Sequence, residues 1–137
     1  MSLNRMFDAV ASRYQWQCKD HGGGFWMLYD PQNDIQFSVE LTEVDVWTWA
    51  CSALVMDLDG RSRPPDPSRL LRLNDGQGDE GVVWCFYAIG RHDLGESLYL
   101  KYGGFTPLGD LTVASKLLAT VLRNMQKFTV RTRAMAQ

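Results

Sequence analysis

The sequence predicts an α+β fold in which helices flank an antiparallel, twisted sheet. Three observations favour it: an apolar helical stripe at the N-terminus, strand-like segments through the middle, and a wide apolar stripe from about Asp110 onward. Strands dominate the middle of the chain and helices flank them, in the order α-β-β-β-α-β-β-α. We expect one domain over residues 1–137, with a frayed tail after about residue 130.

The N-terminal helix is predicted by Leu3, Met6, Phe7 and Val10. These residues fall at positions i, i+3, i+4 and i+7, so they share one face of a helix. The helix should fade near residues 14–15.

Three strands should follow the break in structure at Gly22–Gly24. The first is Phe25–Tyr29, and Asp30–Asp34 then has the composition of a turn. Ile35–Leu41 alternates apolar with polar residues, as expected for a strand with one buried and one wet face. Val44–Val55 is the third strand.

The second half begins with a proline-rich loop, Asp57–Pro67, and a short helix, Leu70–Asn74. Val82–Ile89 is apolar on both faces, which predicts a strand that is central in the sheet or covered by another subunit. A loose hairpin at Gly90–Glu96 and a return strand, Ser97–Tyr102, precede the last helix.

Composition bounds the function. The net charge of −2 gives no sign of a nucleic-acid partner, which would need a stripe of basic residues. The one loose basic cluster is interpreted as a solvated face, and it consists of Arg61, Arg63, Arg69 and Arg72. No run is long and apolar enough to span a membrane, and the N-terminus lacks the apolar core of a signal peptide. The three cysteines are odd in number and far apart, which indicates a reducing compartment, by default the cytoplasm.

Candidate chemistry is sparse. Cys18 and His21 have the C-x-x-H spacing of metal ligands, but a structural zinc site needs four ligands and His92 has no cysteine nearby. A Cys18–His21 nucleophile pair would need a third group to orient it. Gly22–Gly24 lacks the Lys-Ser/Thr end of a phosphate loop, and Asp57–Gly60 lacks the closing glutamate of a calcium loop. We expect no catalytic residue, metal or cofactor, and a chain that acts through its surfaces.

The element order resembles the class I type III secretion chaperones. The features that carry the resemblance are the leucine-rich segment Leu70–Asn74, the glycine-rich break after it, the strand with its charged hairpin, Ser97–Leu100 and the long terminal helix. The upstream helix and three strands follow in the same order, so the resemblance covers roughly residues 3 to 130. It implies a cytoplasmic homodimer without enzymatic activity that binds an extended N-terminal segment of a secreted effector and keeps it secretion-competent.

The resemblance also implies two sets of site residues. The dimer seam would be formed by Leu70, Leu71, Leu73, Val83, Trp84 and Phe86. The effector would lie over the N-terminal helix and the first sheet, and the inward-facing half of its candidate contacts would instead be core. These candidates are Phe7, Val10, Trp26, Leu28, Ile35, Phe37, Trp47 and Trp49.

Three other functions remain open. A YbjN-like regulatory or adaptor domain of the same fold would dimerise without effector cargo. A small enzyme would depend on Cys18 and His21. A domain for lipid or another small ligand would line a pocket with the aromatic residues.

Overall fold

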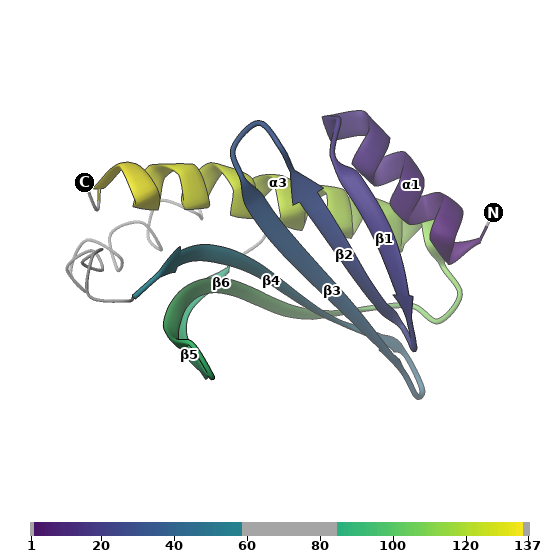
Figure 1. The fold of residues 1–137 in the computed structure, drawn as a ribbon. Helices are drawn as coiled ribbons and strands as arrows, with labels where there is room; N and C mark the ends of the chain where they lie inside the picture. The colour runs from purple at the N-terminus through teal and green to yellow at the C-terminus, as the bar shows by residue number, and fades with distance from the viewer. Residues whose placement is uncertain (1, 59–84, 136–137) are drawn as a thin grey trace.

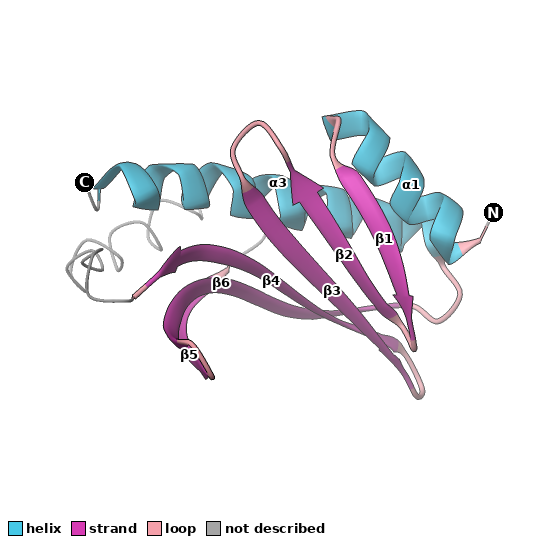
Figure 2. Cartoon of the chain, in the orientation of Figure 1, coloured by secondary structure: helices cyan, strands magenta, loops and turns pink. Residues whose placement is uncertain are grey.

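The computed structural model describes residues 2–58 and 85–135 and has the α+β architecture that the sequence predicts. Six strands form one antiparallel sheet in the order β1-β2-β3-β4-β6-β5. Both helices pack on the same face of this twisted sheet, and α3 runs across it (Figure 1 and Figure 2). The elements are α1 (Leu3–Tyr14), β1 (Gln17–Gly22), β2 (Phe25–Asp30), β3 (Ile35–Glu43), β4 (Trp47–Asp57), β5 (Phe86–His92), β6 (Gly95–Thr106) and α3 (Leu111–Met135).

Helix α1 forms where the apolar stripe predicts it. The Ser2 hydroxyl caps its first turn by accepting a hydrogen bond from the Arg5 backbone N–H at 3.2 Å. The helix ends at Gln15, which adopts a left-handed conformation with φ of 60°. Met6, Phe7 and Val10 are buried against the sheet.

Strand β1 is an element that the sequence analysis missed. Its residues are almost all exposed, so they carry no apolar alternation from which a strand could be predicted. It is held by its backbone pairing with β2, at the edge of the sheet. The glycines at 22–24 all have positive φ and form the turn of this β1–β2 hairpin, which explains why glycine occupies the run. Four strands therefore precede residue 58, where three were predicted.

The second half differs from prediction in two places, the hairpin and the last helix. Among the described residues strand β5 lies at the edge of the sheet beside β6, so the other predicted alternative, a second face covered by another subunit, stays a prediction. The β5–β6 hairpin is tight, because His92 pairs with Gly95 across a two-residue turn. Helix α3 continues to Met135 in place of the predicted fraying, and Thr132 and Arg133 bond it to the rest of the fold. The predicted helix at Leu70–Asn74 lies outside the described residues.

Aromatic rings make up much of the core between α1 and the sheet. Phe7 stacks on Trp26 with ring centroids 4.3 Å apart, and meets the edge of Trp49 at 6.2 Å. Trp16 stacks on Phe37 at 4.7 Å. These contacts place the aromatic residues on one face of the sheet, beneath the helices.

Two polar side chains fix α3 on the sheet. Asp30 is buried, and its carboxylate accepts hydrogen bonds from Gln126 of α3 at 2.8 Å and from the backbone and side chain of Asn33. Arg133 donates to the carbonyl oxygens of Val55 and Asn33 at 2.6 and 2.7 Å. Burial alone would raise the pKa of Asp30, but the hydrogen bonds to its carboxylate outweigh burial and lower that pKa.

Replacing Asp30 by Asn should lower the free energy of unfolding by about 2 kcal/mol near neutral pH. The new amide N–H group would face the amide donors of Asn33 and Gln126, which would lose their acceptor. The pKa of Asp30 is lower in the folded chain than its usual 3.8, so its contribution is complete above that pH and is lost as the pH falls below it.

Chemical denaturation of the unaltered chain and D30N, at about pH 7 and between about pH 4 and 2, checks both statements. The matched control is Asp45→Asn, which alters an exposed carboxylate and should leave stability nearly unchanged. A D30N deficit that stays constant down to about pH 2 would contradict this role for the Asp30 carboxylate.

Candidate functional site

All eight effector contacts that the resemblance implies lie in the core. The most exposed of them are Trp47 and Trp26, at 6% and 5%, and they fill the space between the sheet and the helices. As the chain is folded, these side chains present almost no surface to a partner, although Trp26 also lines a pocket at the margin of the core. The surfaces open to a partner are built from the residues that alternate with them.

The opposite face of the sheet carries no described helix and is hollowed. Half-buried Phe25 and Met27 of β2 form one side of a groove of about 250 Å³, and Leu54 of β4 and Tyr99 of β6 form the other. Ser38 and Ser52, which pair across β3 and β4, also line the groove. Because the serine side chains are much smaller than the apolar side chains on either side, the surface is deeper over the serines and forms the bottom of the groove.

Tyr99 is held in place on this open face. Its ring lies against the backbone of Gly90 in β5, where an added Cβ would come within 2.7 Å of the ring. Lys101 places its ammonium 5.7 Å from the ring centroid. The aromatic wall of the groove is therefore fixed by contacts from two strands.

Strand β5 forms one edge of the sheet and exposes apolar side chains. Phe86 and Ile89 are 53% and 60% exposed, and they point to opposite faces because Phe86 pairs with Lys101 and Ile89 with Leu98. Of the six residues predicted to form a dimer seam, the structure describes Phe86. The other five predicted seam residues, Leu70, Leu71, Leu73, Val83 and Trp84, lie outside the described residues.

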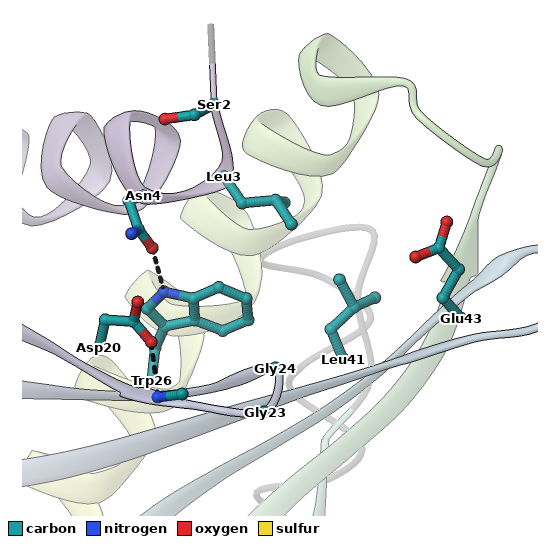
Figure 3. A pocket seen from close by; sticks show the side chains of 10 residues that line it. Ser2, Leu3, Asn4, Asp20, Gly23, Gly24, Trp26, Leu41 and Glu43 are labelled. Carbon is teal, nitrogen blue, oxygen red and sulfur yellow. Dashed lines mark hydrogen bonds between the residues drawn. The ribbon is translucent and has the colours of Figure 1, made fainter.

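A second hollow, of about 530 Å³, lies where α1 begins beside the β1–β2 hairpin (Figure 3). Leu3, Trp26 and Leu41 supply apolar surface, and Asp20 and Glu43 supply carboxylates. The Trp26 indole N–H donates to the side chain of Asn4 at 3.0 Å, which fixes the ring. The sequence analysis did not find this pocket, because its residues come from four segments with no common spacing.

Gly24 closes one wall of this pocket by a tight backbone contact. Its carbonyl oxygen accepts a hydrogen bond from the Leu41 N–H at 2.7 Å. A Cβ added at Gly24 would lie 2.7 Å from the Leu41 carbonyl oxygen, whereas one added at Gly23 would meet nothing within 4 Å. Glycine is therefore required at Gly24 by space as well as by its positive φ.

The Cys18–His21 pair does not have the environment of a nucleophile. Burial raises the pKa of Cys18 to about 11, with Asp8 and Asp20 adding to the rise, so the thiol stays protonated at neutral pH. His21 packs edge-on against the Phe25 ring, with centroids 5.8 Å apart. The charged groups that act on the Cys18 pKa, Asp8 and Asp20, are acids, whereas a reactive thiolate needs a nearby positive charge.

The structure does bring together a serine, a histidine and an aspartate. Ser97 donates its hydroxyl proton to Asp57 at 2.8 Å and lies 2.8 Å from Nε2 of His92. Nδ1 of His92 accepts from the Leu94 backbone N–H, so Nε2 carries the proton and donates to Ser97. In a hydrolase the histidine lies between the carboxylate and the hydroxyl, whereas here the serine does, and Ser97 is 1% exposed. The network joins the end of β4 to the β5–β6 hairpin.

Within residues 2–58 and 85–135, His, Cys, Asp and Glu side chains do not gather in a group of three that could hold a metal ion. Neither described helix combines the length and apolar character needed to cross a bilayer.

Comparison of the chain with protein-family models, with curated proteins and with solved structures finds no match. Its function is therefore inferred from the surfaces of the folded chain.

Gly24→Ala should destabilise the chain more than Gly23→Ala. Both glycines have positive φ, 76° and 63°, so both variants strain the backbone by about 1 kcal/mol. Only at Gly24 would the methyl group also push against the Leu41 carbonyl, adding about 1 kcal/mol or more. Thermal or urea unfolding of the two variants measures the difference, and equal losses would show that the contact with Leu41 is not needed.

Proposed function

We propose that this chain is a cytoplasmic, homodimeric chaperone that binds an extended N-terminal segment of a type III secreted effector and keeps it secretion-competent. It has no enzymatic activity of its own in this proposal. The observation that carries the proposal is the open face of the sheet, with its apolar groove between Phe25, Met27, Leu54 and Tyr99.

The groove suits an extended segment better than a folded partner. Its walls stand on β2 on one side and on β4 and β6 on the other, with β3 between them, and its volume of about 250 Å³ holds one or two side chains at a time. An extended chain turns alternate side chains to one side, so it can place apolar residues in such a groove one after another. An unfolded apolar segment is also the kind of cargo that must be kept from aggregating.

The order of elements gives further support. A leading helix, a run of antiparallel strands, a two-strand hairpin and a long final helix follow the order on which the resemblance to type III secretion chaperones rests. The chain has one additional strand, β1, at the start of that run. The assignment to secretion depends on this resemblance, whereas the assignment to a binding module depends on the groove.

The dimer would form along β5. Among the described residues this strand has a neighbour, β6, on one side only, and Phe86 and Ile89 leave apolar surface uncovered beside its free edge. A second copy placed there would bury both side chains. An adaptor domain of the same fold would share this dimer but lack the cargo.

Light scattering should give a mass twice the 15.6 kDa of the monomer. Ile89→Asp and Phe86→Asp should shift the chain to monomer, because each places a charge in an interface that excludes water. Leu94→Asp is the control, since Leu94 is 90% exposed at the hairpin tip. A monomer for the unaltered chain at micromolar concentration would rule out the dimer.

Met27→Glu and Leu54→Glu should each weaken binding of an effector segment by about tenfold or more, because each buries a charge against an apolar ligand. The affinity is measured by calorimetry with N-terminal segments of secreted proteins whose genes lie beside the gene for this chain. Thr42→Glu adds the same charge on the same face outside the groove and should change little. A stable dimer that binds none of these segments would favour the adaptor function instead.

A further inference from the structure

The pocket beside the start of α1 is lined partly by carboxylates, whereas the groove on the open face has no charged residue in its lining. It has a volume of about 530 Å³, and it joins apolar surface to two carboxylates. We propose that it receives the side chain of a lysine or arginine from the bound partner segment. This inference rests on the proposed function and adds to it one residue class of the cargo.

The apolar part of the pocket matches the stem of a long basic side chain. Leu3, Trp26 and Leu41 come from α1, β2 and β3, and Figure 3 shows the Trp26 ring in the middle of the pocket with the two leucines beside it. The orientation of the Trp26 ring is fixed before any ligand binds, because Phe7 stacks on the ring and its N–H donates a hydrogen bond to Asn4. Lysine and arginine bury methylene groups on such a surface while the charged end stays near polar groups.

The charged part of the pocket selects for a cation. Asp20 and Glu43 lie toward opposite ends of the pocket in Figure 3, with the apolar residues between them. Asp20 uses Oδ1 to accept the Gly22 N–H at 2.8 Å. None of the ten lining residues is a cation, and the ion pair found within the described ranges joins Arg91 and Glu96, far along the chain. The pocket therefore presents two carboxylates that form no ion pair with a described lysine or arginine.

Two competing ligand classes fit less well. An anion would gain from the N-terminus of α1, which carries about half a positive charge, but would face two full negative charges. A metal ion needs its carboxylate ligands to converge, whereas Asp20 and Glu43 are separated by the apolar surface of the pocket. A cation on an aliphatic stem satisfies both the charge and the apolar surface.

The β1–β2 hairpin leaves the pocket open on one side. Gly22 and Gly23 line it without side chains, and a Cβ added to either would meet nothing within 4 Å. The backbone of a partner segment can therefore approach this wall closely while its side chain enters.

The test uses NMR on the full chain with three blocked tripeptides, Leu-Lys-Leu, Leu-norleucine-Leu and Leu-Glu-Leu. The signal to follow is the Trp26 indole N–H, assigned with Trp26→Phe. The lysine peptide should shift this signal saturably and bind about fivefold more tightly than the norleucine peptide, which has a similar apolar stem without charge. Added salt should reduce the advantage.

The double variant Asp20→Asn, Glu43→Gln should bring the lysine peptide to the affinity of the norleucine peptide. The control variant Glu40→Gln, Asp45→Asn removes two carboxylates outside the pocket and should keep the preference for lysine. Equal affinities for the lysine and norleucine peptides, or no shift of the indole signal with any of them, would overturn the inference. These outcomes are independent of the effector-binding experiment, which tests the groove through Met27 and Leu54.

Discussion

Burial of one face of a single sheet beneath α1 and α3 is the interaction on which the rest of the structure depends. Phe7 of α1 stacks on Trp26 and meets Trp49, and α3 packs across the central strands. This packing needs every second residue of those strands to be apolar and turned inward. The same register turns the other residues toward a face that no described helix covers, and this face carries the groove.

Polar contacts make the covered side rigid. The Asp30 carboxylate and the Arg133 guanidinium join α3 to the β2–β3 turn and to β4 through short hydrogen bonds. A groove whose strands are held in this way costs little to order when a ligand binds. The two proposed ligand surfaces therefore belong to a preformed scaffold, and the ordering cost falls on the partner segment.

The two edges of the sheet differ in a way that matches the proposed assembly. Edge strand β1 carries Lys19 and Asp20, charged side chains of the kind that discourage another strand from pairing. Edge strand β5 exposes Phe86 and Ile89 instead. The proposed dimer would therefore form at β5, and the β1 end, with its acidic pocket, would stay open to the proposed cargo segment.

The sequence by itself determined the fold class, α1, the clearly alternating strand β3 and the long helix α3, because local apolar periodicity encodes each of them. It could not reveal β1, since an exposed edge strand held by backbone pairing has no such periodicity. It also placed Trp47 and Trp49 among candidate contacts, although both are core. Periodicity groups residues on a face, but only the tertiary structure decides which face the helices cover. The groove and the pocket depend on that choice, because each collects residues from several elements that meet only in the folded chain.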